Sequence, residues 1–235
     1  VTSGKDMEVV QTLADELCEK FPNIASVVNN VTASVSSVAI GEYEIHLAGE
    51  QYLKEKLGPY EFEISANSFF QTNTRGAVVL YDTVKEYAQL TGKESVLDLY
   101  SGTGTIPIWL SDSAKEISGI EIIESAIADA KENCRRNNIS NCNFIVGDIR
   151  HIIAEITRTP DVLIIDPPRT GMHPDVVKQV LTLAPKKIVY VSCNPATLAR
   201  DVGLMKDAYR VAEIQPVDMF PHTFHIETVA RMEKL

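Results

Sequence analysis

The spacing of hydrophobic positions changes along this chain, and the change predicts where helices and strands lie. Between residues 6 and 20, apolar side chains recur every three or four positions, as on one face of a helix. Short apolar runs broken by Asn, Gly and Pro then predict strands at residues 24–31, 34–40, 43–49 and 60–65. We therefore expect residues 1–66 to form a small α+β unit.

From residue 67 onward, helical and strand-like segments alternate. Helices are predicted at residues 74–90, 105–111, 124–138 and 173–184, with another beginning near Pro195. Continuous apolar runs predict strands at residues 95–100, 116–121, 143–148, 161–166 and 187–193. Such alternation favours a mostly parallel sheet covered by helices on both faces. Two final extended runs, at 209–220 and 225–234, predict an antiparallel hairpin, and we expect residues 67–235 to form one α/β domain.

Composition and charge limit the classes of protein to which this chain can belong. No run of about 18 apolar residues is present, so no membrane-spanning helix is expected. The four cysteines form no C-x-x-C pair and no secretory signal precedes them, which favours a cytoplasmic protein without a metal or iron–sulfur cluster. The net charge of −10 argues against a strong grip on nucleic acid by this chain alone, because Lys and Arg supply most phosphate binding.

Acidic residues end four successive predicted strands: Asp98, Glu121, Asp148 and Asp166. Ligands of parallel sheets bind at this edge, and an acid about 20 residues after a glycine-rich turn commonly accepts ribose hydroxyls. The turn here contains Gly102 and Gly104, but Pro107 stands where a dinucleotide fingerprint has its third glycine. A ring of acids suits a cofactor with ribose hydroxyls, an amine and a positive charge. S-adenosylmethionine has all three.

Several short motifs occur together in one order along the chain. They are S-F-F-Q-T-N at residues 68–73, D-P-P-R-T-G at 166–171, S-C-N-P at 192–195, and D-M-F-P-H-T-F-H-I-E at 218–227. With them, the chain resembles the RNA (uracil-5-)-methyltransferase family from about residue 57 to its end. The resemblance implies a Rossmann-like class I methyltransferase sheet. It also implies that the first 56 residues end a central domain, and that this is a C-terminal fragment without the family's RNA-binding TRAM domain.

The resemblance also implies a mechanism and the residues that carry it. Cys193 would add to C6 of a uracil, and Glu227 would remove the C5 proton after methyl transfer from S-adenosylmethionine. Asp166 would lie beside both the base and the cofactor. Activity at neutral pH predicts a lowered pKa for the Cys193 thiol. The cofactor residues implied are Gln71, Tyr100, Gly102, Glu121, Asp148 and Asp166.

The same resemblance leaves the RNA open. To reach C5 and C6 the enzyme must take the uridine out of its stack, which favours a loop or an opened stem. The segments S-C-N-P-A-T-L-A-R-D and D-M-F-P-H-T-F-H-I-E look closer to the 23S rRNA branch, with the T-loop of tRNA as the alternative. Arg169 and Arg200 would contact RNA phosphate or pair with acids.

Two other functions compete with this hypothesis. Methylation of an amino group would use the same cofactor, but Arg169 replaces the aromatic residue that often follows Pro-Pro in such enzymes, and amine methylation has no need of Cys193. A non-catalytic module that binds S-adenosylmethionine or RNA is the other alternative. The presence of both Cys193 and Glu227 argues against it.

Overall fold

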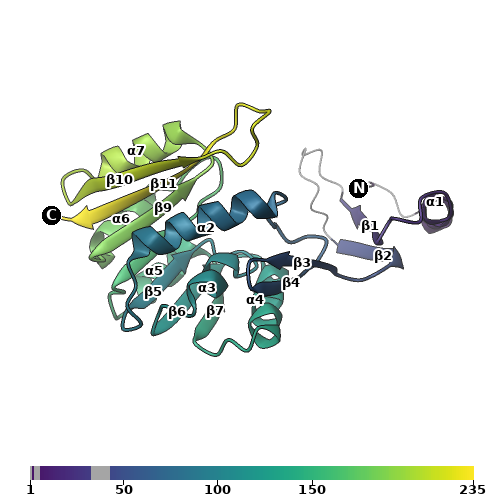
Figure 1. The fold of residues 1–235 in the computed structure, drawn as a ribbon, viewed down its shortest axis with the longest axis horizontal. Helices are drawn as coiled ribbons and strands as arrows, with labels where there is room; N and C mark the ends of the chain where they lie inside the picture. Colours follow the sequence, from purple (N-terminus) through teal and green to yellow (C-terminus); the bar gives the residue numbers. More distant parts are fainter. Residues whose placement is uncertain (1, 3–5, 33–42) are drawn as a thin grey trace.

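A mostly parallel sheet forms the centre of the protein in the computed structural model, which describes residues 2, 6–32 and 43–235 (Figure 1). Within these residues the large sheet has seven strands, in the order β10-β11-β9-β8-β5-β6-β7. Its strands are β5 (Ser95–Leu99), β6 (Glu116–Glu121), β7 (Cys142–Val146), β8 (Val162–Ile165), β9 (Lys187–Ser192), β10 (Tyr209–Val217) and β11 (Glu227–Lys234). β10 and β11 pair antiparallel, and β11 also pairs antiparallel with β9. The predicted fold class, including the C-terminal hairpin, is confirmed.

Helices cover both faces of this sheet. One face carries α2 (Thr74–Ala88), α3 (Thr105–Leu110) and α4 (Glu124–Arg136), whose buried side chains share a core with β5, β6 and β9. The other face carries α5 (Ile149–Glu155), α6 (Pro174–Leu183) and α7 (Pro195–Met205). Every side chain of β5 and β8 is buried, as expected for strands covered on both sides.

The remaining elements lie before the large sheet in the sequence. They are α1 (Met7–Lys20), β1 (Ser26–Val31), β2 (Tyr43–Gly49), β3 (Leu53–Leu57) and β4 (Tyr60–Ile64). α1 and the β1–β2 pair lie at one end of the molecule, away from the sheet (Figure 1). The β3–β4 hairpin instead packs on the large domain, because Leu57 and Phe62 are fully buried in the core that α2 and α4 share. A domain boundary near residue 66 stays a prediction.

Most predicted elements are present, with ends shifted by a few residues. The strand predicted at residues 34–40 lies outside the described residues. Sequence reasoning missed β3 and α5. β3 reads L-K-E-K-L and exposes four of its five residues, so it has no apolar run. α5 is only seven residues long, which is too short for a helical repeat to stand out.

Candidate active site at the carboxyl ends of the strands

Three of the four acids predicted at strand ends lie along one edge of the sheet, and the fourth, Asp98, lies within a strand. β7, β6, β5 and β8 are adjacent and parallel, so their carboxyl ends meet at that edge. Glu121 is the last residue of β6, Asp148 caps the N-terminus of α5 just after β7, and Asp166 follows β8 directly. Asp98 is inside β5 and is 1% exposed.

The turn after β5 has an unusual backbone. Tyr100, Gly102 and Gly104 have φ values of 69°, 51° and 78°, in the left-handed region. Glycine adopts this region freely, but a tyrosine there is uncommon and often marks a functional turn. The Gly102 amide donates to Glu121 Oε2 at 3.1 Å, and Glu121 Oε1 accepts from the amides of Ile122 and Ile123. These bonds hold the glycine turn against the end of β6.

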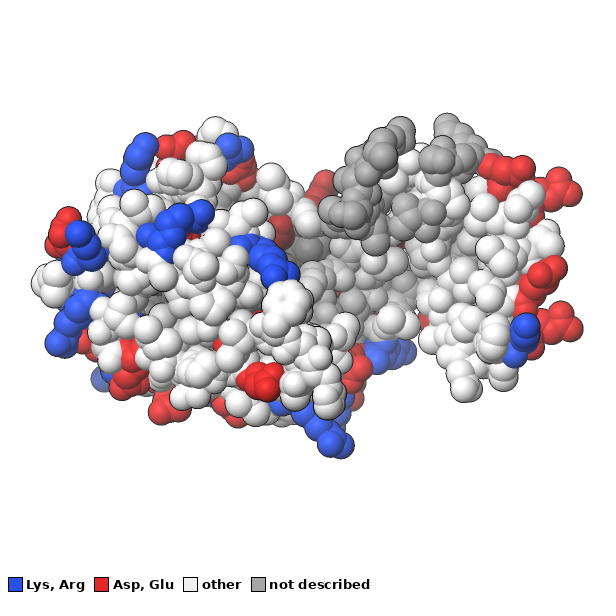
Figure 2. Space-filling view, turned by 90° about the horizontal axis from the view of Figure 1, so that it is seen from above, with Lys and Arg blue, Asp and Glu red and all other residues white. Residues whose placement is uncertain are grey.

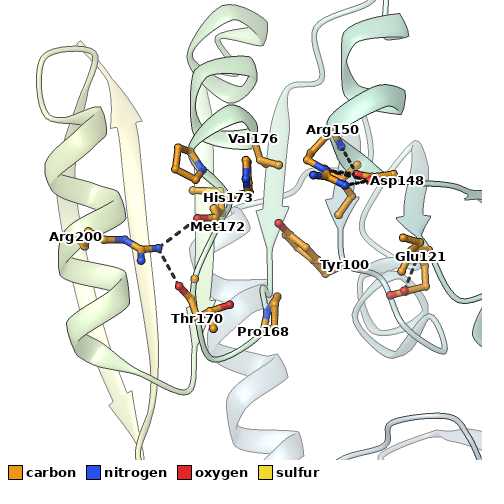
Figure 3. A pocket seen from close by; sticks show the side chains of 14 residues that line it. Tyr100, Glu121, Asp148, Arg150, Pro168, Thr170, Met172, His173, Val176 and Arg200 are labelled. Carbon is orange, nitrogen blue, oxygen red and sulfur yellow. Dashed lines mark hydrogen bonds and ion pairs between the residues drawn. The ribbon is translucent and has the colours of Figure 1, made fainter. Parts of the chain in front are cut away.

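A cavity of about 460 Å³ opens beside this turn. Tyr100, Glu121 and Asp148 line one side of it, and His173 and Arg200 lie across from them (Figure 3). The structure therefore brings three of the predicted cofactor residues together. Hydrogen bonds from the Arg150 side chain and amide lower the pKa of Asp148 to about 2, so this carboxylate is charged and already engaged. Burial raises the pKa of Tyr100 to about 12.

Three buried polar side chains at the same edge lack partners within the described part of the chain. They are Asp98, through both carboxylate oxygens, Ser101 and Thr103. Burial raises the pKa of Asp98 well above its usual value, and the charges of Asp166 and Glu121 add to the effect. Unsatisfied buried polar groups are costly, and a ligand that donates hydrogen bonds would satisfy them. The acids that line the cavity, Glu121 and Asp148, fit a cofactor with hydroxyl and ammonium donors. Sequence reasoning placed Asp98 in the ring but not among the site residues.

Strand pairing brings Cys193 and Glu227 together across 34 residues of sequence. Thr228 of β11 pairs with Ser192 of β9 in an antiparallel register. Glu227 precedes that pair and Cys193 follows it, so both residues leave the sheet at the same place. β8 is the other neighbour of β9, and Asp166 follows β8. The two carboxyl groups and the thiol are close enough to perturb one another's titration.

The pKa of the Cys193 thiol is raised, which corrects the expectation of a lowered pKa. Burial is the main cause, followed by the negative charges of Glu227 and Asp166; Arg169 acts in the opposite direction. Burial and the Glu227 charge raise the pKa of Asp166 to about 7. Burial also raises the pKa of Glu227. The thiol is therefore protonated at rest and stands beside two carboxyl groups with raised pKa values, of which Asp166 can exchange a proton near neutral pH.

Hydrogen bonds hold the turn after Cys193 in place. Asn194 caps α7 by accepting from the Ala196 amide at 3.1 Å, and Pro195 occupies the first turn, where its missing N–H costs nothing. The Asn194 side chain also donates to the Arg169 carbonyl at 3.2 Å. This bond ties the segment after Asp166 to the segment after Cys193. Arg200 pairs with Asp201 and donates to the carbonyl of Thr170, so it pairs with an acid, one of its two predicted roles.

Gln71 lies elsewhere. It lines a second cavity of about 590 Å³, bordered by β1, β3 and residues 64–72. Its segment is held by Asp129 of α4, whose Oδ2 accepts from the hydroxyls of Ser65 and Ser68 at 2.7 and 2.6 Å. The structure does not bring Gln71 into the cavity that Tyr100 lines, and its role at the cofactor stays a prediction.

The sheet order and the strand-end site define the class: a Rossmann-like methyltransferase fold. Solved structures agree. A Pyrococcus abyssi tRNA (uracil-54, C5)-methyltransferase in complex with S-adenosyl-L-homocysteine is 39% identical, with a TM-score of 0.78 over 92% of this chain and 52% of that one. Trm5b of the same organism, at 18% identity and a TM-score of 0.65, shares the fold.

Sequence comparisons give the family. The sequence model of the tRNA (uracil-5-)-methyltransferase family matches residues 11–235. Relatives described as uncharacterized RNA methyltransferases occur in Halalkalibacterium halodurans, at 44% identity over 97% of this chain, and in Chlorobaculum tepidum, at 45% over all of it. The chain spans about half the length of these relatives. It belongs to the tRNA (uracil-5-)-methyltransferase family.

Proposed function

We propose that the protein transfers a methyl group from S-adenosylmethionine to C5 of a uridine in RNA, through a covalent bond between Cys193 and C6. The observation that carries this proposal is the β9–β11 register, which sets Glu227 beside Cys193 with Asp166 on the neighbouring strand. A nucleophile, a base and a second titratable acid in one place are what methylation of a weakly nucleophilic carbon requires. An amine-methylating enzyme would have no use for the thiol.

The first step is addition of the thiol to the base. The Cys193 sulfur bonds to C6, the C5–C6 double-bond electrons move toward C5 and O4, and the thiol proton passes to Asp166. With a pKa near 7, the Asp166 carboxyl is able to accept that proton and then, as a neutral acid, to donate a hydrogen bond to the enolate. A raised thiol pKa suits such a site, because the thiolate forms only when a base takes its proton.

The second step transfers the methyl group and restores the aromatic uracil ring. S-adenosylmethionine, when bound, supplies the electrophilic methyl group that C5 attacks. The Glu227 carboxylate then takes the C5 proton, the C6–sulfur bond breaks as the C5–C6 double bond reforms, and the departing Cys193 thiolate takes back the proton held by Asp166. Tyr100, Gly102, Glu121 and Asp148 are the side chains and turn proposed to hold the cofactor.

The RNA is proposed from sequence resemblance and from relatives. The residues around Cys193 and Glu227 resemble the 23S rRNA branch, so we propose a uridine of 23S rRNA in the cytoplasm. The solved relative from Pyrococcus abyssi is named for uridine 54 of tRNA, and this specific observation favours tRNA as the second candidate. Among the described residues, no helix is long and apolar enough to cross a membrane, and no three His, Cys, Asp or Glu side chains are grouped as metal ligands.

One experiment tests the chemistry and another the RNA. RNA transcribed with 5-fluorouridine should form a denaturation-resistant adduct with the full-length protein and S-adenosylmethionine, because fluorine does not leave as a proton. Cys193→Ala should abolish the adduct, whereas Cys18→Ala on α1 should not. An adduct that survives in Cys193→Ala contradicts the mechanism. Mapping 5-methyluridine in 23S rRNA and tRNA of a deletion strain decides between the two RNAs.

A further inference from the structure

The loop between β10 and β11, residues 218–226, carries an aromatic ring that faces solvent. Phe224 is 84% exposed, more than any other large apolar side chain that the structure describes. The loop projects beyond the end of the sheet (Figure 1). Exposing a phenylalanine forfeits the free energy that its burial would provide. Single exposed apolar side chains are common on proteins, so what distinguishes this ring is how it is held and where its loop leads.

The loop is held in place by hydrogen bonds. The Asn73 side chain, which caps α2, donates to the Met219 carbonyl at 2.7 Å. The Thr223 amide donates to the Phe220 carbonyl at 2.9 Å, and the His225 amide donates to the Thr223 hydroxyl at 3.1 Å. Met219 itself is 1% exposed. These hydrogen bonds fix the residues on both sides of Phe224, while its ring points outward.

The ring of Phe224 is backed by a second ring. Its centroid lies 4.2 Å from that of His225, with 38° between the planes. One face of Phe224 is therefore supported, while its high exposure leaves surface for a ligand. Glu227, the proposed base, follows three residues after Phe224, and Cys193 lies next to Glu227 through the β9–β11 register. The platform formed by Phe224 and His225 therefore belongs to the loop that leads directly into the proposed base, Glu227.

Charge alone offers little grip for RNA on this face. Figure 2, which views the molecule from above, shows Lys and Arg standing singly among acidic and uncharged side chains. The net charge of the chain is −10. Single-stranded nucleic acid also binds by stacking its bases on aromatic rings. When a uridine leaves its stack, the neighbouring base loses a stacking partner that a protein ring can replace.

We propose that Phe224, supported by His225, is a stacking platform for a nucleobase next to the target uridine. This inference rests on the proposed function and adds a residue that binds and positions the RNA. Because any base offers a π-face, the platform contributes affinity and position, and the uridine pocket contributes the choice of base. An exposed phenylalanine could also bind a protein partner. The experiment below distinguishes base stacking from protein binding.

Binding of a fluorescein-labelled single-stranded RNA of alternating adenosine and uridine to the full-length protein tests the platform by fluorescence anisotropy. Phe224→Ala should weaken binding roughly 5- to 150-fold, the range for loss of one base–aromatic stack. Phe224→Trp should retain it. Ile214→Ala removes a 56% exposed side chain from β10 and should change nothing. The same RNA with abasic ribose in place of adenosine should bind wild type more weakly, yet bind wild type and Phe224→Ala almost equally.

Unchanged affinity in Phe224→Ala overturns the platform and favours a protein-docking role for the ring. So does an equal loss on intact and abasic RNA, because the ring would then act without touching a base. The 5-fluorouridine adduct reports on the proposed function separately. An adduct that still forms with unchanged RNA affinity in Phe224→Ala refutes the platform alone, whereas failure of wild type to form any adduct refutes the proposed function.

Discussion

The side chain of Asn133 on α4 forms two hydrogen bonds with the backbone of Glu63 in β4. Its Oδ1 accepts from the Glu63 amide at 2.7 Å, and its Nδ2 donates to the Glu63 carbonyl at 3.1 Å. Asn137 repeats this pattern at Glu61, and Asp129 accepts from the Ser65 amide. Four helical residues rise about 6 Å and two strand residues about 6.6 Å, so the two repeats match.

The hydrogen bonds from Asn133 and Asn137 to β4, which we call the clamp, predict a large stability loss for Asn133→Ala. Asn133 is fully buried, so the substitution leaves the Glu63 amide and carbonyl without partners. Each unsatisfied buried group costs about 1–3 kcal/mol, which predicts a loss of about 2–6 kcal/mol in the free energy of unfolding. Urea denaturation measures it. The exposed Asn143→Ala in β7 is the control, expected within about 0.5 kcal/mol of wild type. Equal losses would contradict the clamp.

The glycine turn predicts different costs at two positions. A Cβ at Gly104 would lie 2.9 Å from Phe144 Cζ and 3.0 Å from Ala130 Cβ, whereas one at Gly102 meets nothing within 4 Å. Both have positive φ. Gly102→Ala should therefore lose about 1–2 kcal/mol from backbone strain, and Gly104→Ala a further 1–3 kcal/mol from overpacking. Thermal unfolding checks the order. A Gly102→Ala protein less stable than Gly104→Ala would refute this account.

The Asp98 carboxyl group is buried and has no hydrogen-bond partner within the described residues. We therefore predict that Asp98→Asn stabilises the protein at neutral pH. The folded state raises the pKa of this group above its ordinary 3.8, so Asp98 holds its proton more tightly in the folded than in the unfolded protein, and its own contribution to stability falls as pH rises above about 4. Asparagine does not titrate. The gain from Asp98→Asn should therefore grow from pH 4 to the folded pKa, measured by urea unfolding without cofactor. Exposed Asp207→Asn should show no such growth.

The charges around Cys193 predict opposite shifts in its reactivity. Glu227→Gln removes a negative charge and should lower the thiol pKa, whereas Arg169→Gln removes a positive charge and should raise it. The rate of alkylation by iodoacetamide against pH, followed on the peptide that contains Cys193, measures both. Wild type should lie between the two variants. Identical profiles for all three proteins would mean that neither charge acts on the thiol.

Glu227→Gln also separates the two chemical steps. Without a carboxylate to take the C5 proton, methylation turnover should fall by about 10²- to 10⁴-fold. Addition of Cys193 precedes that step, so an adduct with ordinary RNA should accumulate on denaturing gels. Glu213→Gln on β10 removes an acid that pairs with Arg231 and should turn over normally. Full turnover by Glu227→Gln would exclude this residue as the base.

Local pattern was enough to predict much of the fold. The fully buried strands β5 and β8 read as apolar runs, α2 and α4 as helical repeats, and the strand-end acids follow directly from where those runs stop. β3 was not predicted, because its stability comes from the packing of Leu57 beneath α2. The local sequence L-K-E-K-L does not reveal this contact. The same holds for α5, whose apolar residues are too few to show a period.

The sequence by itself supplied the candidates for chemistry: Cys193 at the end of one predicted strand and Glu227 near the start of another, both marked by the family resemblance, and acids at the ends of the parallel strands. The tertiary structure alone decided how they meet. β11 inserts between β9 and β10, so Glu227 becomes a neighbour of Cys193, a pairing across 34 residues that no local pattern encodes. Burial beside two carboxyl groups then raises the thiol pKa, reversing the expectation from sequence, because desolvation and charge depend on neighbours brought together only by folding.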